Sequence, residues 1–196
     1  MQEKNYSEPF SHFSEWFDKA QKSHPVPQNK AMSLATVDSA GKPSVRVVLL
    51  KEFDERGFVF YTNTTSKKAA DLSNNPHAAL CFYWPAMLKQ VTVIGAVTQV
   101  SEAEAEAYFA TRPKGSQLAA WSSQQSAVLE SRKVLLQKYN MLKKEYANKS
   151  VPRPPYWSGY RLKPESFEFW IAHIYRLNER LRYRREGTGW KKELLY

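Results

Sequence analysis

The chain has 196 residues, of which 42% are hydrophobic and 24% are charged, and this balance excludes an intrinsically disordered chain. The single cysteine, Cys81, excludes an intrachain disulfide and a cysteine-based zinc site. The four histidines lack a metal-binding spacing, so we expect no metal. The formal net charge of +10 predicts an anionic partner, namely nucleic acid, a membrane surface or a phosphorylated small molecule.

Two features of the sequence bear on where the protein works. No segment approaches the roughly 20 consecutive apolar residues that a membrane-spanning helix requires. The first ten residues lack the basic region and the apolar region of a secretory signal. We therefore expect a cytoplasmic protein with no membrane partner.

The apolar pattern along the chain predicts many short strands and a few helices. An N-terminal helical segment is expected within residues 1–25, where aromatic residues recur at helical spacing after Ser7 and Pro9. Strands are expected at 31–37, 44–53, 58–62, 77–84 and 89–100. Helices are expected at 65–75, at 101–110, where Ser101 and Glu104 form a capping box, and at about 126–147.

The C-terminal part, residues 151–196, begins with a rigid proline-rich linker and ends in a hairpin around a glycine-containing turn. Many strands without a βαβ rhythm predict an antiparallel β-barrel with flanking helices, an α+β fold that is mainly β. We expect residues 1–196 to form a single domain in which residues 151–196 complete the barrel and the active site.

One candidate anion site involves the second expected strand and the start of the helix expected at 65–75. Arg46 and Lys51 are five residues apart, so on an unbulged strand they would face opposite sides. Ser66, Lys67 and Lys68 stand at a helix start, where free N–H groups attract anions. A solvated turn with a capping serine is the simpler interpretation of these residues taken alone.

A second candidate site lies in the segment YFATRPKGS. Tyr108 and Arg112 are four residues apart and share one helical face, and Ser116 follows the end of the helix. A phenol, a guanidinium and a hydroxyl at one helix end can clamp a phosphate. An amphipathic helix that ends in an exposed arginine is the alternative.

An arginine-rich strand is expected near the C-terminus. Polar residues alternate there with apolar ones, and the polar face consists of Arg176, Asn178, Arg180, Arg182 and Arg184. Cations on one face repel each other unless anions or carboxylates compensate them. A basic β-surface that binds nucleic acid is therefore an open alternative.

No nucleophile elbow, P-loop or dinucleotide-binding glycine motif is present, so an enzyme of this sequence would depend on a bound cofactor. Several segments occur in the order found in the pyridoxine/pyridoxamine 5′-phosphate oxidase family, which the chain resembles. They are RVVLLK, YTN with TSKKA, QVTVIG, YFATRPKGSQLAAWSSQQS, VPRPPYWSGYRL, and FEFW with RLNER. The resemblance implies an FMN-binding split β-barrel and a homodimer whose two FMN sites are built from both chains.

The resemblance also implies roles for particular residues. The residues that match the FMN contacts are Arg46, Val47, Val48, Leu49, Leu50, Lys51, Tyr61, Thr62, Lys67, Lys68, Gln90, Gln125, Ser126, Trp170 and Arg180. The residues that match the substrate contacts are Lys51, Tyr108, Arg112, Ser116, Arg176 and Asn178. Arg176 and Asn178 are the matches to the catalytic positions that cover the substrate ring, whereas Arg182, Arg184 and Arg185 receive no role.

The implied reaction is the FMN-dependent oxidation of pyridoxamine 5′-phosphate and pyridoxine 5′-phosphate to pyridoxal 5′-phosphate, with O2 as acceptor and H2O2 as product. A related split-barrel FMN oxidase with another substrate, of the phenazine type, is the first alternative. A non-enzymatic basic β-barrel that binds nucleic acid is the second, and we expect no nucleic-acid partner.

The sequence departs from the family pattern beside the catalytic positions. Asn178 stands where a histidine is usual and Glu179 where an aspartate is usual, and a glycine-containing run is replaced by residues 171–173. Asparagine donates and accepts hydrogen bonds but cannot carry a proton near neutral pH. Lys67 stands at a position where arginine is common in the family, and a lysine cannot make the two parallel hydrogen bonds of a guanidinium.

Overall fold

The structure, a computed structural model of the chain, describes residues 7–23 and 27–196. Its strands are β1 (Ala31–Val37), β2 (Pro43–Leu49), β3 (Glu52–Asp54), β4 (Gly57–Asn63), β5 (His77–Trp84), β6 (Lys89–Gln99), β7 (Trp157–Ile171), β8 (Glu179–Glu186) and β9 (Gly189–Leu195). Its helices are α1 (Glu8–Ser23), α2 (Lys67–Asn74), α3 (Glu102–Ala110), α4 (Lys114–Ser122) and α5 (Arg132–Glu145). Short 3₁₀ turns are η1 (Pro27–Lys30), η2 (Pro85–Met87) and η3 (Ile174–Arg176). Residues 1–6, 24 and 25 of the expected N-terminal helical segment lie outside the described residues.

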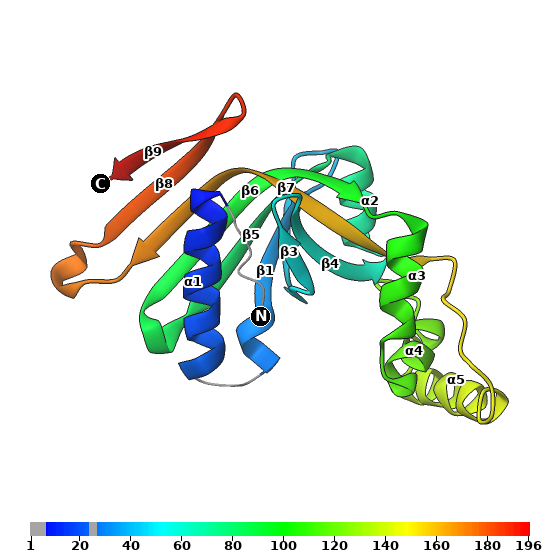
Figure 1. Cartoon of the computed structure of the whole chain (residues 1–196). Coiled ribbons are helices and arrows are strands. Elements are labelled where there is room, and N and C mark those ends of the chain that lie inside the picture. The colour runs from blue at the N-terminus through cyan, green and yellow to red at the C-terminus, as the bar shows by residue number, and fades with distance from the viewer. Residues whose placement is uncertain (1–6, 24–26) are drawn as a thin grey trace.

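The described strands form one antiparallel sheet that curls around α1 (Figure 1). The strand order is β2-β1-β5-β6-β7-β4-β3, and the β8–β9 hairpin also joins β7. The long strand β7 pairs with β6 along one edge, while β4 and β8 pair with its first and second parts along the other. The sheet therefore opens between β4 and β8, and the expected antiparallel, mainly β fold with flanking helices is confirmed.

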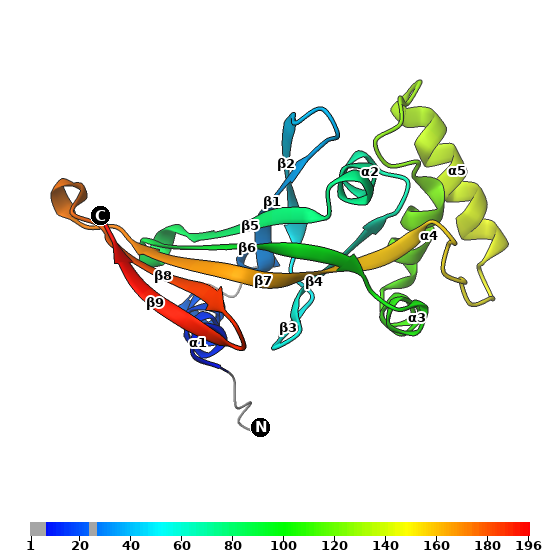
Figure 2. The ribbon, with the colours of Figure 1, turned by 90° about the horizontal axis from the view of Figure 1, so that it is seen from above.

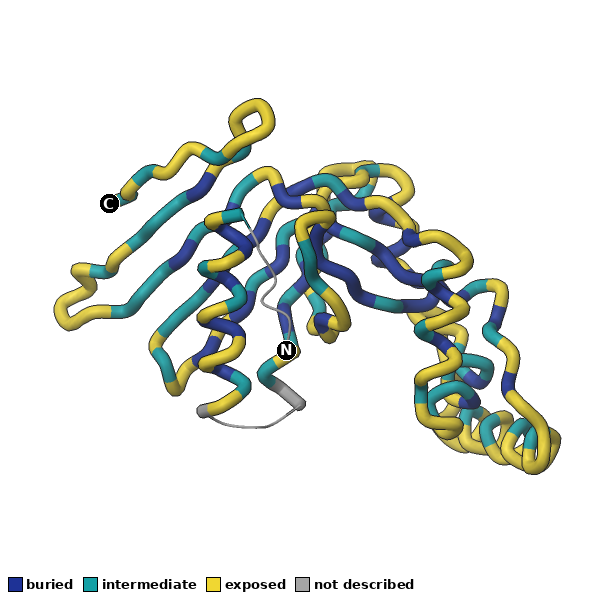
Figure 3. The backbone as a smooth tube through the Cα atoms, in the orientation of Figure 1, coloured by how far each residue is buried: buried dark blue, intermediate teal, exposed yellow. Residues whose placement is uncertain are grey.

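The main core lies between α1 and the concave face of the sheet. Phe10 and Phe13 of α1 are fully buried, and their rings contact Phe58 of β4 at centroid distances of 5.8 and 4.8 Å. Phe167 of β7 meets Phe10 edge to face. Figure 3 shows the buried residues gathered in the central strands and on the side of α1 that faces them. Burial of these aromatic rings stabilises the curled sheet, since each ring removes a large apolar area from water.

The helices α3, α4 and α5 lie together at one end of the sheet, and the β8–β9 hairpin lies at the other (Figure 2). The helical end has its own small core, which contains Phe109, Leu118, Val151 and Trp157. The side chain of Trp157, at the start of β7, joins this core to the sheet. The small core therefore fixes α3 and α4 against the end of the sheet.

The expected strand at 44–53 is interrupted, and this corrects the prediction that Arg46 and Lys51 face opposite sides of one strand. β2 pairs with β1 and ends at Leu49, whereas β3 begins at Glu52 and pairs with β4. Between them the Leu50 N–H donates to the Lys30 carbonyl (2.8 Å) and the Lys51 N–H donates to the Val59 carbonyl (2.9 Å). The chain thus exchanges one partner strand for another, and the face rule of a continuous strand does not apply.

Two helices also differ from the sequence prediction. The expected helix at 126–147 begins at Arg132 and ends at Glu145, because the segment before it is irregular and Ser126 has a φ of 74°. Helix α4 was not predicted, since its residues show little amphipathic pattern. The capping box that opens α3 is confirmed, with the Glu104 N–H donating to Ser101 Oγ at 3.2 Å.

The expected arginine-rich strand is shorter than its alternating pattern suggested. β8 begins at Glu179, so Arg176 and Asn178 lie in the preceding loop and do not belong to the strand face. The strand's arginines are compensated by carboxylates from neighbouring strands. Arg180 pairs with Glu168 of β7 at 2.8 Å, and Arg182 pairs with Glu193 of β9 at 2.7 Å. These pairs reduce the like-charge repulsion that such a strand would otherwise carry, although Glu193 also serves Arg184 at 3.7 Å and Lys191 at 3.3 Å.

Candidate functional site

An open cavity of about 840 Å³ lies where β2 and β4 meet α2 and the segment from α3 to residue 126. It brings together most of the residues that the family resemblance implies. They are Arg46, Val47, Val48, Leu49, Lys51, Tyr61, Thr62, Lys67, Lys68, Tyr108, Arg112, Ser116, Gln125 and Ser126. Because the strand breaks before Lys51, both Arg46 and Lys51 line this one cavity. Leu50 does not line it, since its side chain is buried in the main core.

One end of the cavity carries three cations around the start of α2. Arg46 comes from β2, while Lys67 and Lys68 open the helix after Ser66. The Lys67 backbone N–H donates to Ser126 Oγ at 3.1 Å, which ties the helix start to the irregular segment. The first turn of a helix and adjacent cations together favour a bound anion.

Lys68 is buried within this group. Its Nζ donates to Gln125 Oε1 at 2.7 Å, and lies 3.2 Å from Thr62 Oγ1 and from Ser66 Oγ. Burial, and then the nearby positive charge of Arg46, lower the pKa of the Lys68 ammonium to about 8. Its polar partners are neutral oxygens, and among the described residues no carboxylate lies within 4 Å of the ammonium.

The other end of the cavity is built on a stack of aromatic rings. Tyr61 of β4 stacks on Tyr108 of α3, at a centroid distance of 4.0 Å, and on Trp157 of β7, at 5.2 Å, and the Tyr108 and Trp157 rings are 6.2 Å apart. The planes are inclined by only 13° and 8°. Gly159 leaves room for the stack, because a Cβ there would come within 2.7 Å of the Tyr61 ring. Burial raises the pKa of Tyr61 to about 12, so its phenol stays neutral.

Arg112 lies at this aromatic end without a charged partner among the described residues. Its guanidinium sits 4.7 Å from the Trp157 ring centroid and 5.5 Å from that of Phe109. Its Nη1 is buried and has no hydrogen-bond partner within the described part of the chain. Such a buried donor is costly unless a ligand satisfies it. Lys51 lies nearby, with its Nζ 5.9 Å from the Tyr108 ring centroid.

Helix α3, which positions Tyr108 and leads into Arg112, is held by ion pairs. Arg161 of β7 pairs with Glu104 at 2.6 Å. Arg153, in the proline-rich linker, pairs with Glu102 and with Glu106, the latter at 3.0 Å. Both arginines are largely buried, so these charge-assisted contacts fix the helix more firmly than exposed pairs would.

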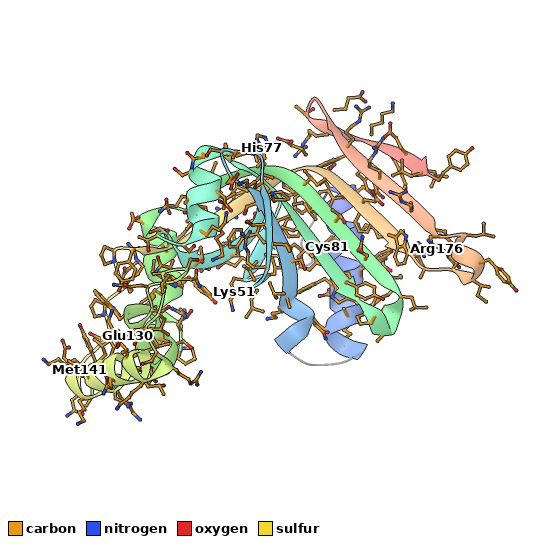
Figure 4. The ribbon with its side chains drawn as sticks, turned by 180° about the vertical axis from the view of Figure 1, so that it is seen from behind. Lys51, His77, Cys81, Glu130, Met141 and Arg176 are labelled. Atoms are coloured by element: carbon orange, nitrogen blue, oxygen red, sulfur yellow. The ribbon has the colours of Figure 1, made fainter. Side chains whose placement is uncertain are left out.

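The remaining implied residues form a second group at the opposite end of the sheet. This group contains Gln90, Trp170, Arg176, Asn178 and Arg180, none of which lines the cavity. Gln90 of β6 is the strand neighbour of Trp170 on β7, which is in turn the neighbour of Arg180 on β8. Figure 4 shows Lys51 and Arg176 on well separated parts of the molecule. One chain therefore presents two separate groups of the implied residues.

The loop before β8 holds Arg176 in an exposed position. Tyr175 and Arg176 have φ values of 58° and 61°, in the left-handed region that non-glycine residues rarely adopt. The His173 N–H donates to Asn178 Oδ1 at 3.1 Å, and His173 Nε2 lies 2.8 Å from Glu179 Oε1. These two contacts close the loop, so Asn178 supports its conformation.

Comparison with known proteins identifies the family. Residues 18–144 match the family described as pyridoxamine 5′-phosphate oxidase. The chain belongs to the pyridoxamine 5′-phosphate oxidase family. Residues 157–196, which form β7, β8 and β9, match the region described as the pyridoxine 5′-phosphate oxidase C-terminal dimerisation region.

Similar proteins support the same assignment. The pyridoxine/pyridoxamine 5′-phosphate oxidase of Brucella canis is 50% identical over 193 residues, which cover 97% of this chain and 94% of the relative. That of Rubrobacter xylanophilus is 49% identical over 185 residues, covering 94% and 85%. These relatives show an oxidoreductase of the pyridoxamine 5′-phosphate oxidase family along nearly the whole chain.

Solved structures support the fold. The crystal structure of PhzG from Burkholderia lata 383 in complex with tetrahydrophenazine-1-carboxylic acid has a TM-score of 0.91 and 34% identity, covering 97% of this chain and 93% of that one. A pyridoxamine 5′-phosphate oxidase-related, FMN-binding protein from Nostoc punctiforme has a TM-score of 0.76 at 18% identity, covering 96% and 97%. The split-barrel fold that the sequence resemblance implied is confirmed. Among the described helices, none is long and apolar enough to cross a membrane.

Several residues that shape the cavity were not among the predicted site residues. Trp157 completes the aromatic stack, and Thr111 and Pro113 line the cavity beside Arg112. Thr36 and Asp71 lie behind Arg46 and contact its guanidinium. Trp157 stands in the segment VPRPPYWSGYRL that carried the resemblance, but Thr36 and Asp71 have no sequence signal, because 35 residues separate them.

Proposed function

We propose that the chain is an FMN-dependent oxidase that converts pyridoxamine 5′-phosphate and pyridoxine 5′-phosphate to pyridoxal 5′-phosphate, with O2 as electron acceptor and H2O2 as product. The observation that carries this proposal is that one cavity has two separate cationic ends. Arg46, Lys67 and Lys68 stand at one end, and Arg112 with its unsatisfied buried Nη1 stands at the other. Two phosphates, one on the cofactor and one on the substrate, account for both ends.

The residues at the α2 end fit the phosphate of FMN. Three cations converge there with the Ser126 hydroxyl, and Lys68 is buried without a charged partner within 4 Å among the described residues. A dianionic phosphate would supply the missing negative charge. The residues Val47, Val48 and Leu49 continue from these cations along β2 and line the cavity, with Val47 and Leu49 exposed on one face of the strand, so this stretch offers an apolar edge to an aromatic ring system.

The chemistry that FMN would supply when bound is that of a two-electron acceptor, which takes one hydride from the substrate and whose electrons O2 finally receives. The chain's own residues would then serve to bind and orient. Arg112, Lys51, Ser116 and Tyr108 would hold the substrate phosphate, so that the reactive carbon is fixed by its anchored phosphate group. The rigid stack of Tyr61 on Tyr108 and Trp157 keeps this anchor in one place.

We infer that a second copy of the chain completes each site. The sheet face that points away from α1 carries Val47 and Leu49, which are 66% and 41% exposed. The pairing register across β1 and β5 places Gln90 of β6 and Trp170 of β7 on this same face. A self-complementary contact through this face would place the Gln90 and Arg176 group of one copy near the cavity of the other. The matched dimerisation region supports the homodimer.

In such a homodimer Arg176 and Asn178 would cover the substrate from the partner side. Arg176 is exposed and held in a defined loop, so it is available to a neighbouring copy. Asn178 uses its Oδ1 to accept from the His173 N–H. Its role in this proposal is to hold Arg176 in position, with no proton transfer by the amide.

The similarity to PhzG supports one alternative, an oxidase that acts on a reduced phenazine carboxylic acid. The relatives that are about 50% identical carry the pyridoxine/pyridoxamine name, whereas PhzG is 34% identical. The deciding experiment incubates FMN-loaded protein with each B6 phosphate, with the unphosphorylated vitamers and with tetrahydrophenazine-1-carboxylic acid. We expect aldehyde formation and O2 uptake with the phosphates alone, and turnover of the phenazine alone would refute the proposal.

The variant Arg112→Ala tests the substrate end of the cavity. Loss of charge-assisted contacts made in both the ground and transition states should raise KM for pyridoxamine 5′-phosphate by about tenfold to a hundredfold, with a smaller change in kcat. Lys114→Ala is the matched control, because Lys114 lies two residues away and its Nζ donates to the Ala147 carbonyl outside the cavity. An unchanged KM in Arg112→Ala would contradict the assignment of this end to the substrate phosphate.

A further inference from the structure

Asp71 is a buried carboxylate directly behind the cationic end of the cavity. It lies on α2 with 3% of its surface exposed, and it does not line the cavity. Thr36 of β1 is completely buried beside it. A charge this deeply buried requires partners, and both carboxylate oxygens of Asp71 have them.

One Asp71 oxygen and Thr36 together hold Arg46. Thr36 Oγ1 donates to Asp71 Oδ2 at 2.6 Å and accepts from Arg46 Nη1 at 2.7 Å. Arg46 Nη2 lies 3.7 Å from the same Oδ2, and Arg46 Nη1 also donates to the Leu34 carbonyl at 3.1 Å. Because the threonine hydrogen is donated to Asp71, the hydroxyl oxygen acts toward Arg46 as an acceptor, and this favours one orientation of the guanidinium.

The other Asp71 oxygen holds Lys67. Lys67 Nζ donates to Oδ1 at 3.0 Å across one turn of α2, and lies 4.0 Å from Asp38. Burial would raise the pKa of the Asp71 carboxyl, but hydrogen bonds from Thr36 and Lys67 lower it below its usual value. Asp71 therefore stays ionised at neutral pH, and one carboxylate contacts two of the three cations at this end.

We propose that Asp71 and Thr36 are positioning residues that hold Arg46 and Lys67 toward the cavity before the phosphate of the cofactor arrives. The inference rests on the proposed function, since it assumes that this end binds the phosphate of FMN. Arginine and lysine side chains lose much rotamer freedom when they bind a ligand. Holding them in advance reduces that cost, which is how preorganisation raises affinity.

The test compares FMN with riboflavin, which has the same ring system but no phosphate. The variant Thr36→Val keeps the volume and the charges of the site but removes the hydroxyl that orients Arg46. In titrations of the apoprotein followed by flavin fluorescence, we expect Thr36→Val to weaken FMN binding by about fivefold to thirtyfold. Riboflavin binding should stay within about twofold of wild type, because riboflavin has no phosphate for Arg46 to contact.

Two controls accompany this comparison. Thr36→Ser restores the hydroxyl and should recover most of the FMN affinity. Thr98→Val changes an exposed threonine on β6, outside the cavity, and should alter neither ligand. A Thr36→Val protein with the wild-type ratio of FMN to riboflavin affinity would overturn the positioning role. Wild-type protein that binds neither flavin would refute the proposed function instead.

Should Thr36→Val fail to fold, Asp71→Asn replaces it in the same titration. The amide oxygen still accepts from Thr36, but the charge that orients Lys67 and Arg46 is lost. A lower FMN affinity with unchanged riboflavin affinity supports the positioning role. A higher FMN affinity would overturn it, because it would show that the carboxylate acts on the phosphate only as a repelling charge.

Discussion

Lys68 differs from the other two cations of the α2 end in having no carboxylate partner within 4 Å among the described residues. Arg46 and Lys67 both contact Asp71, whereas Lys68 is surrounded by the oxygens of Thr62, Ser66 and Gln125. Its ammonium is therefore charged at neutral pH but loses its proton more readily than an exposed lysine. A phosphate beside it would raise its pKa again, so binding and protonation are coupled.

This coupling predicts that FMN affinity depends on pH. The pKa of Lys68 lies at about 8 in the free protein, so the charged form dominates below pH 8 and the neutral form above it. FMN affinity should therefore be greatest below pH 8 and fall as the pH rises through 8 toward 9.5. Titrations of the apoprotein with FMN across this range measure the effect, and riboflavin should show a nearly flat profile because it carries no phosphate.

Lys68→Met provides the control for this prediction. It removes the ammonium at every pH, so FMN should bind more weakly than to wild type at pH 7, and this difference should become smaller at pH 9.5. Parallel wild-type and Lys68→Met profiles, with no convergence at high pH, would show that another group is responsible for the dependence.

At the scale of elements, the loop between β7 and β8 combines an unusual backbone with a small number of supporting contacts. Tyr175 and Arg176 occupy the left-handed region consecutively, which costs on the order of 1–3 kcal/mol per residue. The bond from the His173 N–H to Asn178 Oδ1 is one of the contacts that hold this conformation. Loss of that contact should therefore weaken the hold on Arg176.

Removal of the contact should impair turnover without affecting the cofactor. We expect Asn178→Ala to lower kcat/KM for pyridoxamine 5′-phosphate by about fivefold to tenfold, since one hydrogen bond contributes about 1 kcal/mol. FMN affinity should stay close to wild type, because the cations of the α2 end are held by other elements and by contacts that do not involve this loop. Asn178→His keeps an acceptor at Nδ1 and should retain equal or higher kcat; full activity in Asn178→Ala would show that the loop needs no such support.

The elements that could be predicted from the sequence are those whose signal is local. The strands at 31–37 and 77–84 alternate regularly between buried and less buried residues, and the Ser101 and Glu104 capping box lies within one turn of helix. The interruption at Leu50 could not be predicted, because it arises when the chain leaves β1 and pairs with β4. The choice between partner strands is a property of the tertiary fold.

The residues of the candidate site also divide into those with a local sequence signal and those that only the tertiary fold brings together. Its cations were predicted because short ordered motifs contain them, such as TSKKA for Lys67 and Lys68. The support behind them was not predicted, since Asp71 reaches Thr36 only after α2 packs on β1. Which of the predicted residues share a cavity also required the structure, because Gln90 and Trp170 lie at the end of the sheet opposite α3 and α4.

At the scale of the whole molecule, the positive charge is divided between internal pairs and open sites. Arg180 and Arg182 on β8 are matched by Glu168 and Glu193, so this strand presents less free charge than its composition suggests. Arg112 has no carboxylate partner within 4 Å in the described part of the chain, and it lies in the cavity. The distribution favours small anionic ligands at a built site over a broad basic surface for nucleic acid.

The separation of the implied residues into two groups predicts a specific result for mixed dimers. If each site uses the cavity of one chain and the loop of the other, Arg112→Ala damages the cavity and Arg176→Ala damages the loop that covers the partner's cavity. In a heterodimer of the two variants, one site carries both changes and the other carries neither. Such a heterodimer, isolated through two different affinity tags, should show about half of the wild-type activity per dimer.

The two variant homodimers serve as the reference, since both of their sites carry one change. Their kcat/KM for pyridoxamine 5′-phosphate should fall well below that of the heterodimer, and the KM of the heterodimer's intact site should equal the wild-type value. A heterodimer no more active than its parents would mean that Arg112 and Arg176 act within one chain. The β7–β8 loop would then have to move across the sheet to reach the cavity, because the structure places the two groups at opposite ends.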